Sequence, residues 1–180
     1  RIELAGLTQA RALEPLLFGP SLGLRLVDLP KDFSTGIRYN WLSGNLADEP
    51  RGYRLSDNAT QFGVSLSWRV FSRNKVQGYL GMFGEVVNTR REASGYNLTV
   101  GRIYEGSGYM VSFSGRADYA MGEFVNVFLS VEQGCRWYSS FEDRAPDEPI
   151  LGRPLANGWY GGGCLGVSLV IKSDESENRN

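Results

Sequence analysis

Charged side chains recur on one face of several alternating segments, and arginine supplies most of the positive ones. The chain's lysines are Lys31, Lys75 and Lys172. Arginine, with its planar fork of donors, suits fixed ion pairs in confined places, whereas lysine suits open water. The recurring charges are Arg25, Arg38, Arg69, Glu85, Arg116, Asp118, Glu132 and Arg136. If these side chains share an enclosed space, they must pair with one another, since isolated buried charge is costly. We therefore predict an ion-pair network rather than a solute pathway.

The same residues offer little for catalysis, because the chain contains no histidine. A serine nucleophile would need another base such as lysine, and the three lysines lie in or near turns and at the end of the last expected strand. Carboxylates alone can do acid and base work when their surroundings separate their pKa values. Nearby arginines would instead keep Glu85, Asp118 and Glu132 ionised. The sequence predicts a protein that is not an enzyme.

No cofactor or metal site is expected. Cys135 and Cys164 fall on opposite parities of the alternating pattern, so a disulfide between them is not expected either. Acidic residues gather in connecting segments, where calcium is the one ion they could take. Because no EF-hand spacing is present, solvated charge is the simpler interpretation. The glycines at 161–163 lack the strand, loop and helix of a phosphate site and favour sheet bending.

Strict alternation of apolar and polar residues identifies the elements that must position these charges. From Phe62 to Val70 the apolar residues occupy one parity, while glycine, serine and arginine occupy the other. That pattern is typical of a strand with one apolar and one polar face. Residues 109–121 and 125–137 repeat it at a length that is unusual for a soluble strand. Shorter or less regular versions lie at 22–26, 37–41, 76–86 and 159–172.

The connections between these segments decide the architecture. Turn-forming residues predict tight turns at 29–33, 72–75 and 122–123. Long polar loops are expected at roughly 43–60, 88–108 and 139–158. Within the middle loop we interpret Tyr96, Leu98 and Val100 as a hairpin extension. Residues 1–7 supply an eighth strand, and residues 8–17 a fourth loop.

The sequence therefore predicts an all-β protein, an antiparallel up-and-down transmembrane β-barrel of about eight strands. One barrel domain is expected over 1–172, followed by a disordered polar tail at 173–180. A helical membrane protein is excluded, because no apolar run approaches the roughly 20 residues that a spanning helix needs.

This layout resembles the small outer-membrane barrels, the family of the OmpA transmembrane domain and OmpX. Those barrels combine eight strands of about ten residues with short periplasmic turns and longer extracellular loops. The resemblance covers nearly the whole chain and implies a bacterial outer-membrane location, in contact with lipid and lipopolysaccharide. It departs at the end of the chain, where the family commonly has a terminal aromatic residue and this sequence continues past Ile171 and Lys172 into an acidic tail.

A soluble lipocalin-like barrel that binds an apolar ligand would show the same alternation with its apolar face turned inward. The polar face would then meet bulk water and should be rich in lysine, glutamate and threonine. Here it is mostly serine, glycine and asparagine, which suits a crowded lumen. Aromatic residues near strand ends also favour a membrane girdle. They include Tyr39, Trp41, Trp68, Phe71, Tyr109, Trp137, Tyr138, Trp159 and Tyr160.

The function predicted from the sequence is that of a scaffold whose extracellular loops mediate binding or adhesion, or that anchors an envelope complex. Loops on a rigid scaffold often carry function. The contact surface is expected on the loop at 139–158, at Arg144, Pro146, Pro149, Arg153 and Pro154. An envelope or host protein is the expected partner. Nucleic acid is not, because the formal net charge is −1 and the pI about 5.6.

Overall fold

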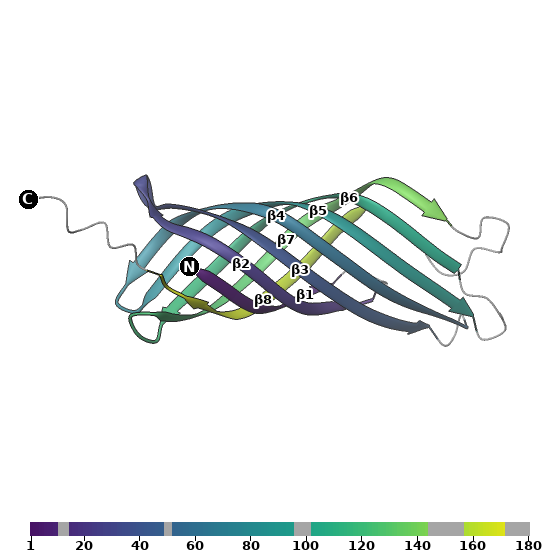
Figure 1. Cartoon of the computed structure of the whole chain (residues 1–180), viewed down its shortest axis with the longest axis horizontal. Helices are drawn as coiled ribbons and strands as arrows, with labels where there is room; N and C mark the ends of the chain where they lie inside the picture. The colour runs from purple at the N-terminus through teal and green to yellow at the C-terminus, as the bar shows by residue number, and fades with distance from the viewer. Residues whose placement is uncertain (11–14, 49–51, 96–101, 144–156, 172–180) are drawn as a thin grey trace, which may run out of the picture.

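The structure, a computed structural model, describes residues 1–10, 15–48, 52–95, 102–143 and 157–171. Within these residues eight antiparallel strands close into one barrel (Figure 1). The strands are β1 (Ile2–Ala10), β2 (Leu17–Leu29), β3 (Phe33–Asp48), β4 (Tyr53–Arg73), β5 (Val76–Gly95), β6 (Arg102–Ala120), β7 (Val125–Asp143) and β8 (Gly158–Leu169), with the short 3-10 turn η1 (Pro30–Asp32) between β2 and β3. The predicted eight-stranded up-and-down barrel is confirmed. Among the described residues, no helix is long and apolar enough to cross a membrane.

Three short connections lie at one end of the barrel and confirm the predicted tight turns. They join β2 to β3, β4 to β5 and β6 to β7. The first strand is also confirmed, and it closes the barrel by pairing on both sides. Leu4 lies opposite Leu22 of β2 and opposite Val167 of β8.

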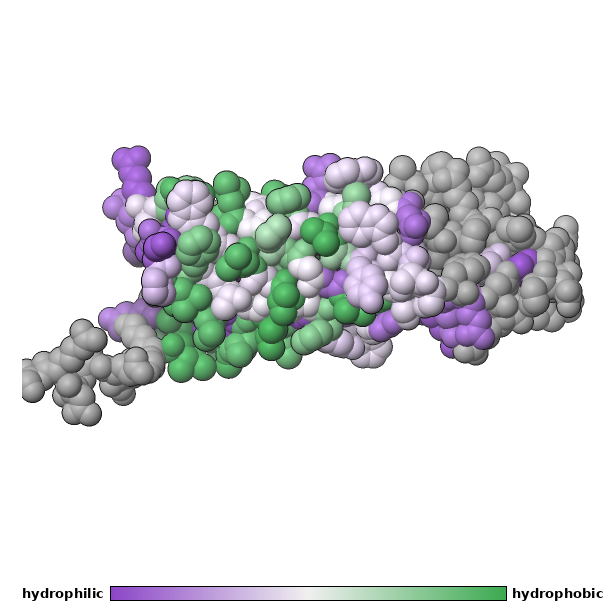
Figure 2. All heavy atoms as spheres, turned by 90° about the horizontal axis from the view of Figure 1, so that it is seen from above, coloured by the Kyte–Doolittle hydropathy of each residue, from purple (hydrophilic) through white to green (hydrophobic). Residues whose placement is uncertain are grey.

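The outer surface near this end is apolar. In β4, Phe62, Val64 and Leu66 are 52%, 58% and 48% exposed although all three side chains are large and apolar. Figure 2 shows such side chains in green over one face of the half of the barrel that carries the tight turns. A patch of this size would be strongly unfavourable in water and suits a bilayer. Because the apolar face points outward, the lipocalin-like alternative is excluded.

The band ends on a row of five outward side chains, four of which are aromatic. Tyr39, Phe62, Val86, Tyr109 and Trp137 lie opposite one another on five consecutive strands, from β3 to β7. On β6 the outward apolar residues run over 109–119, which matches the roughly 9–11 residues of a strand that crosses a bilayer. We call this set of five residues the aromatic row. It lies where the membrane interface is expected, since aromatic girdles border the lipid-facing band of such barrels.

The predicted long loops are wrong in extent, because most of those residues continue the sheet. Beyond the aromatic row, β3 to β7 run on as paired strands that we call the extension. Its members are residues 42–48, 53–61, 87–95, 102–108 and 138–143. In the extension the apolar face turns inward: Leu55 and Ala93 are buried, whereas Arg54 and Asn58 are exposed. The reason is the change of surroundings from lipid to water, which favours apolar side chains on the inward face and polar side chains on the outward face.

On either side of the hairpin predicted for the middle loop, β5 and β6 are paired as far as Ala93 and Arg102. Tyr96, Leu98 and Val100 themselves lie outside the described residues. The same holds for the expected contact surface at 144–154 and for the expected tail at 173–180.

Gly108 allows β6 and β7 to approach each other where their register shifts, next to Ser107. A Cβ at this position would lie 2.7 Å from Tyr138 Cα and closer still to the Trp137 carbonyl oxygen. Backbone atoms cannot move aside as a side chain can. We therefore expect Gly108→Ala to lower the free energy of unfolding by about 1–3 kcal/mol, the usual range for overpacking. Urea unfolding in phospholipid vesicles, followed by tryptophan fluorescence, measures the change.

Gly84→Ala is the matched control, because a Cβ at Gly84 meets nothing within 4 Å. It should leave stability unchanged or raise it slightly, since glycine weakens a strand interior. Equal losses in the two variants would contradict the steric argument and point to a general effect of removing glycine.

Candidate functional site

The lumen of the membrane-spanning part is filled by polar side chains that alternate with the lipid-facing ones. They form two groups, one above the other along the barrel axis. The turn-side cluster comprises Arg1, Glu3, Arg25, Arg116 and Asp118. The central cluster comprises Gln9, Arg38, Asn40, Gln61, Glu85, Glu132 and Arg136. The strand pattern positions both sets, since every second residue of a barrel strand points inward.

In the turn-side cluster, one carboxylate receives three guanidinium groups. Asp118 accepts hydrogen bonds from Arg1 at 2.8 Å, from Arg25 at 3.4 Å and from Arg116 at 2.5 Å. Arg116 also donates to both carboxylate oxygens of Glu3, at 2.7 and 2.8 Å. Asp118 is 2% exposed, so this network holds a charge that would be strongly unfavourable alone.

In the central cluster, one arginine bridges two carboxylates. Arg38 donates from Nε to Glu85 at 2.9 Å and from Nη2 to Glu132 at 3.0 Å. Gln9 donates to Glu132 Oε1 at 3.2 Å and exchanges a hydrogen bond with Gln61 at 2.8 Å. The contacts join five strands across the lumen, so they fix the interior in one arrangement.

Two of the eight predicted network residues differ from the rest. Arg136 is buried in the central cluster but donates to neutral groups, Gln9 Oε1 at 3.0 Å and Tyr138 Oη at 3.3 Å, and none of the ion pairs among the described residues includes it. Arg69 lies apart from both clusters and pairs with Asp32 at the rim formed by the tight turns. The Arg69 side chain is 25% exposed, because it lies at the barrel mouth where water reaches it.

A further buried ion pair lies inside the extension. Arg91 donates from Nε and Nη2 to the two carboxylate oxygens of Asp57, at 2.7 and 2.6 Å, and Arg91 is fully buried. Sequence reasoning missed this pair because it assigned both residues to loops. The signal was present: Leu55, Asp57 and Ala59 share one parity and alternate with polar residues, as in a strand whose inward face is the apolar one.

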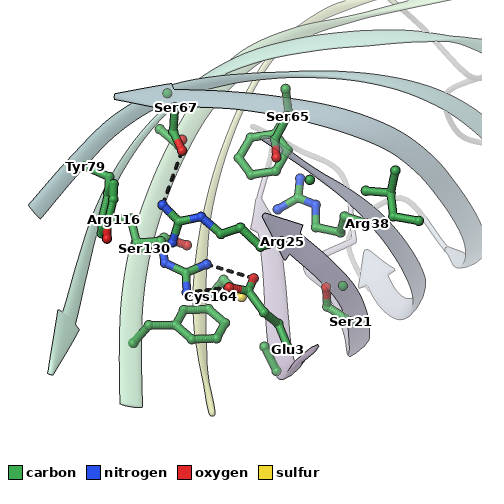
Figure 3. Close-up of a pocket in the computed structure, with 18 of the residues that line it drawn as sticks. Glu3, Ser21, Arg25, Arg38, Ser65, Ser67, Tyr79, Arg116, Ser130 and Cys164 are labelled. Carbon is green, nitrogen blue, oxygen red and sulfur yellow. Dashed lines mark hydrogen bonds and ion pairs between the residues drawn. The ribbon is translucent and has the colours of Figure 1, made fainter. Parts of the chain in front are cut away.

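A small chamber of about 50 Å³ separates the two clusters. Its charged lining is Glu3, Arg25, Arg38 and Arg116, and Figure 3 shows these side chains converging from different strands. The serine hydroxyls at positions 21, 65, 67, 114 and 130 complete its polar lining. A polar space of this size is large enough for a few water molecules, since one molecule needs roughly 10–15 Å³.

Aromatic rings hold the three arginines of the chamber in place. The guanidinium of Arg25 lies 4.0 Å from the centre of the Tyr79 ring. Arg38 lies 4.0 Å from the Phe83 ring, and Arg116 lies 3.7 Å from the Phe128 ring. Each arginine is thus both ion-paired and stacked, which leaves its plane little freedom. The arrangement places ion-paired, ring-stacked arginines across the lumen.

The chamber also receives the thiol of Cys164, whereas Cys135 lies on the outward parity of β7. Both cysteines are free. Among the described residues, no three or more of the histidine, cysteine, aspartate and glutamate side chains gather closely enough to hold a metal ion.

Comparisons with known proteins agree with this architecture. No protein-family model and no curated protein sequence matches the chain. The solved structures that match include Ail, the attachment invasion locus protein of Yersinia pestis, with a TM-score of 0.57 and 9% identity over 93% of this chain and 95% of that one. A major outer membrane protein from Thermus thermophilus matches with a TM-score of 0.61 and 12% identity, over 94% and 99% of the two chains. Neisserial surface protein A matches with a TM-score of 0.54 and 13% identity over 93% of each chain.

These matches are small eight-stranded outer-membrane β-barrels, and this chain has their fold. The sequence identities are too low to carry any residue's role from them to this protein. Together with the lipid-facing apolar band, the fold is that of a protein of the bacterial outer membrane.

Proposed function

We propose that the protein is a non-enzymatic scaffold of the outer membrane, closed to solutes and built to present its extension and the segments beyond it to partners outside the cell. The observation that carries the proposal is the lumen. Two ion-pair clusters lie across it, and each of their carboxylates is bound by arginine. Beyond the membrane the barrel continues as a sheet of five strands. A rigid sheet of this kind keeps the segments at its outer end in fixed positions, which a binding surface requires.

The absence of histidine and the arginine-bound state of the carboxylates support a role other than catalysis. A general acid or base needs a proton that it can release or take up in the reaction. Asp118 and Glu132 instead accept hydrogen bonds from neighbouring guanidinium groups. We assign these fixed ion pairs a structural role.

The partner is proposed to meet the segment that follows β7, which includes Arg144, Pro146, Pro149, Arg153 and Pro154. Prolines restrict the backbone and lower the entropy lost on binding. Among similar folds, Ail has been solved in complex with the heparin analogue sucrose octasulfate, with a TM-score of 0.56 to this chain and 10% identity. That complex makes a host or envelope macromolecule a reasonable partner class for this chain as well.

Exchanging residues 144–156 for a short glycine-serine linker tests the proposed contact. The strands end before this segment, at Asp143, so the variant should fold and keep the heat-modifiable gel migration of a membrane barrel. Binding of cells that carry the protein to host cells or extracellular matrix should be lost. Unchanged binding by the folded variant would reject this segment as the contact.

The closed lumen has its own test, single-channel recording in planar bilayers. The natural chain should give no steady conductance, because the charged groups and their rings fill the lumen. Replacing Arg38, Glu85 and Glu132 together by alanine removes the bridge across the central cluster and should produce a small, measurable conductance. Steady conductance by the natural chain would contradict the scaffold proposal. Glu92→Ala is the control, because Glu92 lies on the outer surface and its loss should leave the lumen closed.

A further inference from the structure

The chamber between the two clusters is lined by more positive charge than negative charge. Its charged lining consists of one carboxylate, that of Glu3, and the guanidinium groups of Arg25, Arg38 and Arg116. The turn-side cluster contains three guanidinium groups and two carboxylates, whereas the central cluster contains two of each. A charge in a narrow lumen is unfavourable unless a counter-charge lies close to it. The side chains of the turn-side cluster therefore lack one negative charge.

Two of the arginines bring like charges close together at the chamber. Arg25 and Arg116 both contact the carboxylate of Asp118, at 3.4 and 2.5 Å. Arg116 also donates to both oxygens of Glu3, so a second carboxylate compensates it. Among the described residues, Arg25 has the longer contact with Asp118 as its one ion pair, and its other hydrogen bonds go to serine hydroxyls. The excess positive charge is therefore nearest to Arg25.

Two donors that line the chamber have no acceptor among the described residues. Arg38 donates from Nε and Nη2 to Glu85 and Glu132, which leaves Nη1 without a hydrogen bond. The hydroxyl of Ser21 is the second such donor, and Arg38 and Ser21 are only 8% and 5% exposed. Arg38 lies opposite Gly23, two residues along β2 from Ser21, and Figure 3 shows both side chains on one side of the chamber. Since buried donors need acceptors, the chamber requires one that its own lining does not supply.

A small monovalent anion has the matching chemistry. It carries a single negative charge, accepts hydrogen bonds from several donors at once and is only slightly larger than a water molecule. The chamber, at about 50 Å³, has room for such an ion together with water, since one water molecule needs roughly 10–15 Å³. A dianion such as sulfate would replace the excess positive charge by an excess negative one.

We infer that the chamber binds one chloride ion beside Arg25, Arg38 and Ser21. The ion neutralises the turn-side cluster and weakens the repulsion between Arg25 and Arg116. It is a buried part of the folded barrel, so its effect is on the stability of the membrane-spanning part. This site goes beyond the proposed function, which gives the lumen only ion pairs between side chains.

The first test measures how stability depends on chloride. The full chain in phospholipid vesicles is unfolded with urea in sodium chloride and in sodium gluconate at the same ionic strength. Both salts screen exposed charges equally, but gluconate is too large for the chamber. Chloride should raise the unfolding midpoint, because a ligand that binds only the folded state stabilises it. Equal midpoints in the two salts would overturn the inference and leave the chamber to water.

Variants of the charged lining should change the chloride effect in opposite directions. Glu3→Gln leaves the turn-side cluster with three guanidinium groups and one carboxylate, so chloride should bind about tenfold more tightly, which corresponds to about 1.4 kcal/mol. Arg25→Met leaves two of each, so the difference between the two salts should disappear. Heat-modifiable gel migration shows that each variant is folded. A chloride effect that is the same in both variants would place the ion outside the chamber and overturn the inference.

Ser21→Ala tests the site without changing any charge. It removes one hydrogen bond to an anion, so chloride should bind about tenfold more weakly. Ser112→Ala is the matched control: Ser112 is another buried serine of the lumen, 1% exposed, but it does not line the chamber. It should keep the full chloride effect. Equal weakening in the two variants would contradict the assignment to the chamber.

Crystals grown in sodium bromide give a direct readout, because bromide takes the place of chloride and scatters anomalously. An anomalous peak is expected in the chamber, between Arg25 and Arg38, and should be absent from Arg25→Met. Peaks that lie only outside the barrel would overturn the inference.

These outcomes are independent of the proposed scaffold role. The variant with the exchanged 144–156 segment should lose the outside partner and keep both the bromide peak and the chloride effect. Ser21→Ala should keep the outside partner and bind chloride weakly. Failure of either proposal therefore leaves a distinct result.

Discussion

Arg38→Met is expected to lower the free energy of unfolding by about 3–5 kcal/mol, the range seen when one member of a buried ion pair is removed. Arg38 is the one cation that contacts both Glu85 and Glu132 among the described residues, and both carboxylates are nearly inaccessible to water. Methionine replaces much of the stem and the ring contact with Phe83, but it leaves two buried negative charges close together. Urea unfolding in phospholipid vesicles measures the loss.

The triple variant Arg38→Met, Glu85→Gln and Glu132→Gln separates charge from packing. It removes all three charges together, and replacing a whole buried ionic group by neutral residues is often close to neutral in stability. The triple variant should therefore recover most of the loss. If the triple variant is as unstable as Arg38→Met, the loss of stability comes from altered packing and not from charge. If Arg38→Met is as stable as the natural chain, the two carboxylates find another partner and Arg38 does not hold the cluster.

The number of strands and the tight turns could be predicted from the sequence because both depend on local patterns. Residues such as Phe62, Val64 and Leu66 mark an outward face by strict alternation, and the turn at 122–123 follows from its composition. The conclusion that the apolar face meets lipid needed one further fact, the kind of polar residue opposite it. Glycine and serine fit a filled lumen, and the structure shows them there.

The extension could not be predicted in the same way, because its alternation has the opposite sense. On the parity that faces lipid in β4, the residues become polar at Asn58 and Ser56, so the apolar pattern on that parity ends there. The strand in fact continues, with its apolar residues Leu55 and Ala59 on the other parity. The change occurs at the aromatic row, where lipid gives way to water. A strand that crosses this boundary must exchange the roles of its two faces without any break in its backbone pairing.

Individual ion pairs also lay beyond the sequence, because they depend on register and on contacts across the barrel. Glu3 and Arg116 are 113 residues apart in the chain and lie on β1 and β6, which are not neighbours in the sheet. Glu3 therefore could not be singled out from its spacing. Arg69 and Arg25 both lie on the lumen-facing parity of their strands. They differ in depth along the barrel, so Arg69 lies at the rim and Arg25 lies in the turn-side cluster.

Asp118→Asn is expected to have an effect of similar size at the other cluster. The side chain keeps its shape but loses the charge that Arg1, Arg25 and Arg116 share, and three guanidinium groups are then left with the single carboxylate of Glu3. We expect the free energy of unfolding to fall by about 3–5 kcal/mol. Glu3→Gln is the graded control: Arg116 keeps its 2.5 Å contact with Asp118, and Glu3 is less buried, so the loss should be clearly smaller.

A double-mutant cycle shows whether the effect is electrostatic. Adding Arg25→Met to Asp118→Asn removes one of the uncompensated charges, so the double variant should be more stable than the sum of the two single losses predicts. Strict additivity would mean that Arg25, at 3.4 Å from Asp118, does not depend on it and is held by Ser34, Ser67 and the Tyr79 ring instead. Because these neutral contacts stay in place in Asp118→Asn, the cycle separates the ion pair from the packing that surrounds it, and it decides whether the turn-side cluster stabilises the barrel through charge.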